Sequence, residues 1–321
     1  MLIVLAFLCA AGFAARIFLP TGLTGAGDQW YTILNLRLIS AVSALVVGSA
    51  LAVSGVYLQT LLRNPLASPY ILGLAAGAGL GVAASTFITR ISTADNPISP
   101  VWSQQGGAAV GALVVLFIVY TLSRRRGLLD PVTILLVGVM VSAVAGAMIM
   151  LLQFLSPAAD TDSLIRWMMG SISQFTQWHS LITGGIITVA GIIVGLLFSR
   201  ALDVAVLHDD EAQTIGVNIN RLRTILFITA GLLTAAAVVL AGPIGFVGLV
   251  APHIARSIVG PRHFALIIAS AFLGAALILF ADAGVRFLPR THGIMPIGII
   301  TATLGGPVFI WILRRERNQR T

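Results

Sequence analysis

Ten apolar stretches, each close to the length of a membrane-spanning helix, constrain this chain more than any other feature. A hydrocarbon core about 30 Å thick needs about 20 apolar residues in a helix. Hydrophobic residues make up 58% of the 321 positions and charged residues only 9%, too few to cover a water-soluble globule. The stretches lie at 1–19, 37–62, 71–89, 104–123, 132–155, 179–199, 224–241, 244–259, 264–287 and 296–313. They predict an all-α fold, a polytopic membrane bundle of about ten helices that forms one domain over 1–321.

Two of these stretches differ from a simple crossing. The stretch at 244–259 is short and contains Pro252, which predicts a half-helix or a re-entrant segment, with a full crossing as the alternative. The stretch at 1–19 lacks a basic leading region, which favours a membrane anchor over a cleaved signal peptide. The single cysteine, Cys9, excludes an internal disulfide.

Arginine supplies all of the basic charge, because none of the 19 Lys+Arg residues is a lysine. With a cytoplasmic N-terminus and ten spans, 13 of these 19 arginines fall on the cytoplasmic side and 6 outside. The positive-inside rule therefore predicts that both termini are cytoplasmic. A P-loop requires a lysine, so no ATP hydrolysis is expected in this chain.

The longest polar stretch between spans is 200–223, RALDVAVLHDDEAQTIGVNINRLR. The acidic residues at 209–211 suit a helix N-terminus, Gly216 ends that run, and Asn218 suits the cap of a second helix. A connection this long with its own helical pattern is usually functional. A docking surface for a partner protein is therefore favoured over a plain connecting loop.

Two further segments break the helical pattern. In 61–72, LLRNPLASPYIL, the pair Asn64 and Pro65 ends a helix, and both a simple turn and a polar constriction on a pathway remain open. The segment 242–256, GPIGFVGLVAPHIAR, predicts irregular backbone, which a membrane tolerates only beside protein or a water-filled cavity.

Charged and small residues inside the spans carry weaker predictions. Asp282 and Arg286 are four positions apart and can form an ion pair, either functional or merely neutralising. The repeat of Gly73, Gly77 and Gly81 predicts close helix packing. The scattered histidines lack the spacing of a metal site, so no metal is expected.

Four motifs follow one another in a specific order and at specific distances. They are SGVYLQTLLRNPLASPYILGL at 54–74, WMMGS at 167–171, EAQTIGVNINRLR at 211–223, and GPIGFVGLVAPHIAR at 242–256 paired with MPIGIITATLGGPVFIW at 295–311. With these motifs the chain resembles the permease subunits of type II ATP-binding-cassette importers for ferric siderophores, haem and vitamin B12.

The resemblance implies roles for individual residues. Coupling to the ATPase is implied for Asp209, Asp210, Glu211, Gln213, Gly216, Val217, Asn218 and Arg221. A cytoplasmic gate is implied for Asn64, Pro65, Leu66, Pro131 and Val132, and pathway-lining helices for 132–155 and 296–313. Docking of a substrate-binding protein is implied for Arg37, Arg286 and Arg290, although Ser40 stands where the family often has a second arginine.

The resemblance also implies a function and a set of partners. The chain is expected to be the permease of an importer that moves a ferric siderophore, or alternatively haem or vitamin B12, into the cytoplasm by alternating access. Expected partners are two ATPase subunits that bind ATP and Mg, a periplasmic or lipid-anchored binding protein, and a second permease copy or close homologue, in the inner membrane. No cofactor of its own and no nucleic acid are expected. An ion-coupled secondary transporter is the rival, with Asp282 as its candidate carboxylate.

Overall fold

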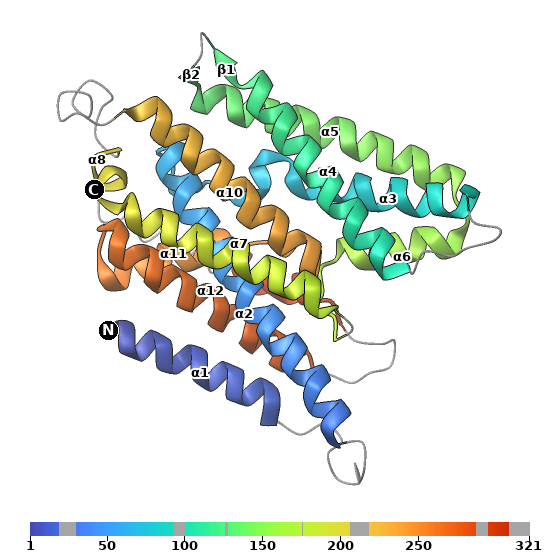
Figure 1. The fold of residues 1–321 in the computed structure, drawn as a ribbon, viewed down its shortest axis with the longest axis horizontal. Helices are drawn as coiled ribbons and strands as arrows, with labels where there is room; N and C mark the ends of the chain where they lie inside the picture. Colours follow the sequence, from blue (N-terminus) through green and yellow to red (C-terminus); the bar gives the residue numbers. More distant parts are fainter. Residues whose placement is uncertain are drawn as a thin grey trace.

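The chain folds into a bundle of helices with one short hairpin, within the residues that the computed structural model describes: 1–18, 30–92, 100–125, 128–174, 176–205, 218–286 and 295–307 (Figure 1). The helices are α1 (Leu2–Phe18), α2 (Trp30–Leu61), the 3-10 helix η2 (Pro69–Leu72), α3 (Leu74–Ser92), α4 (Pro100–Leu122), α5 (Pro131–Leu155), α6 (Ala158–Met168), α7 (Trp178–Leu197), α8 (Ser199–Ala205), α10 (Ile219–Ala241), α11 (Val247–Val259), α12 (His263–Val285) and a final helix, Ile297–Pro307. The hairpin pairs β1 (Arg124–Arg125) with β2 (Leu128–Leu129) in antiparallel register between α4 and α5.

Seven of the described helices are long and apolar enough to cross a membrane, namely α2, α3, α4, α5, α7, α10 and α12. Three other described helices are apolar but shorter, namely α1, α11 and Ile297–Pro307. The prediction of an all-helical membrane bundle is confirmed, and the chain is a multi-pass membrane protein.

Some helix boundaries differ from the predicted ones. Helix α2 begins at Trp30 rather than at 37, because residues 30–36, WYTILNL, contain no proline or glycine that would interrupt it. Helix α10 begins at Ile219 rather than at 224, because the side chain of Asn218 accepts the backbone N–H of Arg221 (3.0 Å) and caps the helix there. Helix α6 lies outside the predicted stretches, since it is too short and polar to read as a span.

Helix α11 has only 13 residues, as expected of the short segment predicted at 244–259, but Pro252 lies inside the helix and does not end it. The irregular backbone is limited to 242–246, and the helix runs through Pro252 from Val247 to Val259. Proline lacks an N–H, so the carbonyl of Gly248, four residues earlier, loses its usual donor. That carbonyl oxygen lies against Gly55 of α2, where a Cβ would be only 1.8 Å away. The neighbouring helix therefore fits closely where the proline leaves a carbonyl exposed.

Helix α2 lies at the centre of the bundle and packs against α7, α10, α11 and α12. Small residues allow this, because a Cβ at Gly48 would lie 2.2 Å from the carbonyl oxygen of Gly274 in α12. Hydroxyl groups add directional contacts: Ser49 donates to the carbonyl of Ala271 (3.1 Å) and Ser54 to that of Ala230 (2.9 Å). The core of the bundle is therefore held by close backbone approach and interhelical hydrogen bonds.

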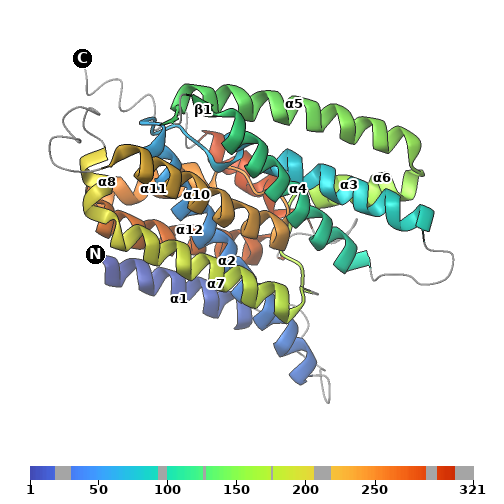
Figure 2. The same cartoon turned by 45° about the horizontal axis from the view of Figure 1, so that its top comes forward.

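Helices α3, α4, α5 and α6 form an arm on one side of the molecule (Figures 1 and 2). A Cβ at Gly81 would lie 1.9 Å from the carbonyl oxygen of Gly107 in α4, and one at Gly111 would lie 2.1 Å from that of Gly77. The predicted close packing is thus confirmed between α3 and α4 for Gly77 and Gly81. Gly73, the third member of the predicted repeat, precedes α3 with φ 75° and faces Gly138 of α5 instead. Figure 2 shows α5 along the outer edge of this arm.

Candidate coupling and transport site

The turn after α2 is built by Asn64, as the sequence predicts. Its backbone N–H donates to the carbonyl of Gln59 (3.1 Å), and its side-chain oxygen accepts the backbone N–H of Leu66 (2.9 Å). Arg63 reverses the chain in a left-handed conformation with φ 46°. The side chain of Leu66 is 40% exposed, and Pro65 is exposed as well. The end of the helix at Asn64 is confirmed, while the gate role of this turn stays a prediction.

The start of α5 carries the second predicted gate region. The carboxylate of Asp130 caps the helix by accepting a backbone N–H from its first turn (2.9 Å), and Pro131 occupies the first helical position. Val132 is 63% exposed. A Cβ at Gly138 would lie 2.1 Å from the carbonyl oxygen of Ile71, so η2 packs closely on α5. The turn after α2 is thus linked to α5 through η2, which follows the turn in the chain.

The predicted coupling residues are only partly covered by the described residues. Asp209, Asp210, Glu211, Gln213, Gly216 and Val217 lie outside them, as does the predicted docking residue Arg290. Asn218 and Arg221 are described and form the cap that begins α10. The last described residue before the gap, Ala205, and the start of α10 at Ile219 lie around the same small cavity as Arg63. Both ends of the coupling segment therefore reach the turn after α2.

A buried histidine joins three elements at this end of the bundle. The Nδ1–H of His263 donates to the carboxylate of Asp203 in α8 (2.7 Å), because a carboxylate only accepts. The Nε2 atom lies 2.9 Å from the hydroxyl oxygen of Thr60 in α2. Sequence reasoning missed this contact, since the three residues are far apart in the chain and each alone reads as a surface or helix-end residue.

Irregular backbone from three of the four motifs meets in one place. The hydroxyl of Tyr70 donates to the carbonyl of Ile244 (2.8 Å) and accepts the N–H of the same residue (2.7 Å). The N–H of Gly298 donates to the carbonyl of Gly170 (3.3 Å). Tyr70 was not predicted to have a role, although it lies inside the first motif. The contacts satisfy backbone groups that lipid would leave without partners.

A charge cluster lies where α1, α2 and α12 meet. The Asp282–Arg286 ion pair is confirmed (3.3 Å), but Arg16 of α1 also donates to Asp282 and to the hydroxyl of Ser40. Side chains of Arg16 and Asp282 are each only 2% exposed. Arg37 is also buried and donates to a backbone carbonyl of α1 (2.8 Å). The predicted docking arginines 37 and 286 thus lie in one cluster, and Arg16, at the end of a distant helix, was missed.

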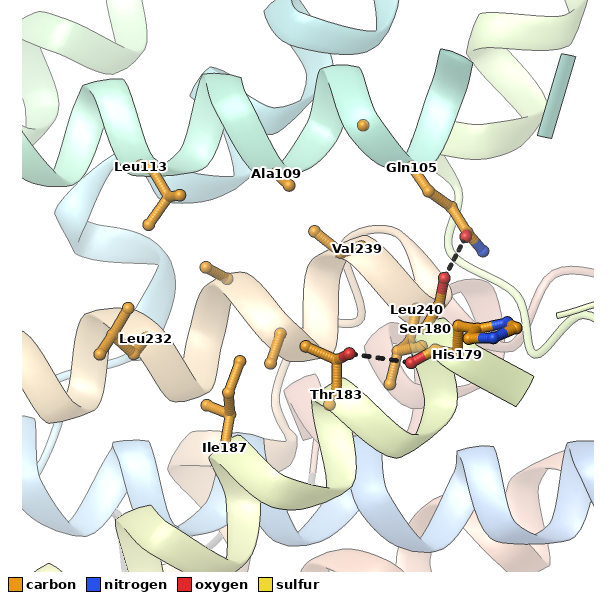
Figure 3. Close-up of a pocket in the computed structure, with 14 residues that line it drawn as sticks. Gln105, Ala109, Leu113, His179, Ser180, Thr183, Ile187, Leu232, Val239 and Leu240 are labelled. Carbon is orange, nitrogen blue, oxygen red and sulfur yellow. Dashed lines mark hydrogen bonds between the residues drawn. The ribbon is translucent and has the colours of Figure 1, made fainter. Parts of the chain in front are cut away.

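A groove of about 350 Å³ separates α4, α7 and α10 (Figure 3). Its walls are mainly apolar, and its polar end is formed by Ser180, which donates to the side-chain oxygen of Gln105 (2.6 Å), next to His179. Among the described residues, no group of three His, Cys, Asp or Glu side chains has the arrangement of a metal site. The Ser180–Gln105 contact joins α7 to α4, whereas Thr183 donates to the carbonyl of His179 within α7 (2.9 Å).

Comparisons with known proteins agree with this architecture. Residues 1–315 match the FecCD transport family. The chain is 38% identical to the hemin transport system permease protein HmuU of Yersinia pestis over 293 residues, covering 91% of this chain and 86% of that protein. It is 36% identical to the cobalamin import system permease protein BtuC of Halobacterium salinarum over 280 residues (87% and 72% covered). It is also 36% identical to the Fe(3+)-citrate import system permease protein YfmD of Bacillus subtilis over 286 residues (89% and 82% covered).

A solved structure gives the same result for the fold. A metal-chelate type ABC transporter in an inward-facing conformation superimposes with a TM-score of 0.85 at 28% identity, covering 98% of each chain. The match extends over the central bundle and the arm alike, since nearly the whole chain is covered. The chain belongs to the FecCD transport family.

Proposed function

We propose that this chain is the membrane permease subunit of an ABC importer for iron chelates, haem or vitamin B12. The observation that carries the proposal is the family match over 1–315, together with relatives named as permeases of import systems for these compounds. The chain itself is a transport subunit rather than an enzyme, and ATP with Mg binds to separate ATPase subunits.

The proposed topology has ten crossings in one domain over 1–321, with both termini in the cytoplasm. Seven long and three shorter apolar helices among the described residues supply these crossings. The charge cluster supports the order of the crossings, because it brings the end of α1, the N-terminal part of α2 and the end of α12 to one side of the bundle. Those are ends that the arginine distribution assigns to the outer side of an inner membrane.

Two ATPase subunits are proposed to dock on the coupling segment at 200–223. Support comes from its two described ends, which lie beside Arg63 and the turn at Asn64. Movement of the segment then reaches the proposed gate, formed by Asn64, Pro65 and Leu66 with Pro131 and Val132 at the start of α5. The result is alternating access by rigid-body movement of helices.

The remaining partners are assigned to the outer end and to α5. The outer end that carries Arg37, Arg286 and Arg290 is proposed to attract acidic residues of a substrate-binding protein, since complementary charge steers and orients docking. Because Arg37 is buried and Arg286 pairs with Asp282, this attraction would come from the excess positive charge of the cluster. A second copy of the permease is proposed to cover α5, whose side chains Val139, Met140 and Val144 are each at least 60% exposed. The helices 132–155 and 296–313 then line the pathway between the copies.

The proposed substrate is an iron chelate, with a ferric siderophore tested first and haem and vitamin B12 as its rivals. The ion-coupled carrier loses support, because its candidate carboxylate, Asp282, is engaged by two guanidinium groups. A carrier needs a carboxylate that gains and releases its ion during each cycle.

The test is uptake by proteoliposomes that contain the permease, its ATPase subunits and its binding protein. We expect uptake that needs ATP inside and persists when ionophores collapse the ion gradients. Glu211→Ala is expected to lower both uptake and substrate-stimulated ATP hydrolysis, because it removes an acidic group from the docking segment. Asp162→Ala, which removes an exposed carboxylate of α6, is the control. Uptake that follows the ion gradient without ATPase subunits would refute the proposal.

A further inference from the structure

Helix α8 is fixed to α12 through a single carboxylate oxygen. Asp203 Oδ1 accepts both the Nδ1–H of His263 (2.7 Å) and the backbone N–H of the same residue (2.8 Å). The imidazole is almost fully buried, with a side chain only 4% exposed, and its other nitrogen lies 2.9 Å from the Thr60 hydroxyl oxygen. We name this group of Asp203, His263 and Thr60 the histidine clamp. Helix α8 cannot shift relative to α12 without breaking two hydrogen bonds to a charged acceptor.

A second contact joins α8 to the turn after α2. The Nε–H of Arg63 donates to the carbonyl of Ala205, the last residue of α8 (3.1 Å). Arg63 directly precedes Asn64, and its left-handed backbone, with φ 46°, is unfavourable for a residue with a side chain. The turn is therefore held in this conformation by its surroundings, and α8 is one of the elements that hold it.

A third contact joins the end of α2 to α11. The guanidinium of Arg256, near the end of α11, donates to the side-chain oxygen of Gln59 (3.3 Å). Thr60, the next residue, belongs to the histidine clamp. The last turn of α2 is thus tied by side chains to α8, α11 and α12, whereas apolar contacts alone would let these helices slide in lipid.

The position of α8 in the chain indicates the order in which movement would pass through these contacts. Helix α8 forms the first part of the coupling segment at 200–223, and the residues proposed to couple to the ATPase, from Asp209 onward, come after it in the sequence. We propose that Asp203 and His263 are positioning residues that transmit movement of the docked segment through α8 to the gate turn at Asn64. The inference rests on the proposed function, and it adds the route by which docking and gating are coupled through a contiguous set of bonded groups.

The test compares two quantities in the same proteoliposomes, substrate taken up and ATP hydrolysed. Asp203→Ala is expected to keep ATP hydrolysis while the amount of substrate moved per ATP falls about tenfold, the scale of one lost charge-assisted hydrogen bond. Asp162→Ala is the matched control, because its carboxylate also pairs with a basic side chain, Arg166, but does so within α6 rather than across to a second helix. The two carboxylates are similarly exposed, at 58% for Asp162 and 41% for Asp203. The control is expected to move as much substrate per ATP as the parent.

A milder variant and a reporter keep the test decisive if Asp203→Ala folds poorly. Asp203→Asn keeps an oxygen acceptor for the backbone of His263 and is expected to give an intermediate ratio. In a Cys9→Ala background, the thiol of Leu66→Cys reports gate exposure through its labelling rate. ATP is expected to change this rate in the parent and to change it less in the Asp203 variants.

The outcomes separate the two proposals. If the parent shows no ATP-driven uptake, the proposed function is wrong and this inference falls with it. If the parent transports, and both Asp203 variants move as much substrate per ATP as the parent and show the same ATP-dependent labelling of Leu66→Cys, the inference alone is wrong. A parallel loss of ATP hydrolysis and uptake at a constant ratio would also overturn it, because the clamp would then serve only to hold the fold.

Discussion

Helices α2 and α5 are both long apolar helices, yet the rest of the chain buries one and leaves the other largely exposed. Helix α2 has 78% of its most apolar window buried by the rest of the chain, whereas α5 has only 22% buried. Helix α5 is nevertheless the more apolar of the two. Hydropathy thus marks both as membrane helices but does not tell which one lies inside the protein.

The difference lies in the size and chemistry of the side chains. Helix α2 presents Gly48, Gly55, Ser49 and Ser54, which allow close backbone approach or donate hydrogen bonds to neighbouring helices. The outward face of α5 instead carries large flexible side chains, Met140, Met148, Met150, Leu151 and Phe154. In lipid, helices associate through packing and hydrogen bonds rather than through water exclusion. Small and hydroxyl-bearing residues therefore mark the faces at which helices pack on one another, and those of α2 face three different helices, α10, α11 and α12.

The largest expected effect comes from filling the closest contact of α2. In Gly55→Val the new Cβ would lie 1.8 Å from the carbonyl oxygen of Gly248, a backbone atom of α11 that cannot move aside cheaply. We expect destabilisation beyond about 3 kcal/mol, the upper range for overpacking, and little folded protein. The measurement is the yield of monodisperse protein in detergent and its unfolding midpoint.

Gly106→Val is the control for this prediction. It introduces the same side chain into α4, where a Cβ at Gly106 meets no atom within 4 Å. Its yield is expected to match the parent. Equal yields for the two variants would show that close packing around α2 does not determine stability.

The second prediction concerns the one side of α5 that the chain does bury. Ile149 is only 4% exposed and belongs to a cluster with Ala78 and Leu164. Ile149→Ala is expected to cost roughly 1–3 kcal/mol, below the usual 2–5 in water, because lipid reduces the transfer contribution and leaves the packing loss. Unfolding midpoints of the isolated permease measure this. An unchanged midpoint would mean that the arm is not packed as described.

The same contrast explains how much the sequence alone can predict. The apolar stretches located the helices, and Asn64 located the turn, because length, hydropathy and capping are local properties. The contact between Arg16 and Asp282 spans 266 positions and that between Asp203 and His263 spans 60. Which helices become neighbours depends on three-dimensional packing, so these charged contacts had no local pattern. That the helix continues through Pro252 could not be predicted for a related reason, since Gly55, which packs against the carbonyl left without a donor, lies on another helix.

The smallest expected effect on the folded subunit comes from the exposed face of α5. Met140 is 68% exposed, so Met140→Ala removes few contacts within the chain. It is expected to change the free energy of unfolding of the monomer by no more than about 0.5 kcal/mol. If a second copy covers this face, the same change removes packing from an interface and shifts the monomer–dimer equilibrium toward monomer. Ile149→Ala is the matched comparison, because it destabilises the subunit from the opposite face of the same helix. Mass measurement in detergent over a range of protein concentrations separates the two effects. An unchanged equilibrium for Met140→Ala, with the parent dimeric, would assign this face to lipid rather than to the second copy.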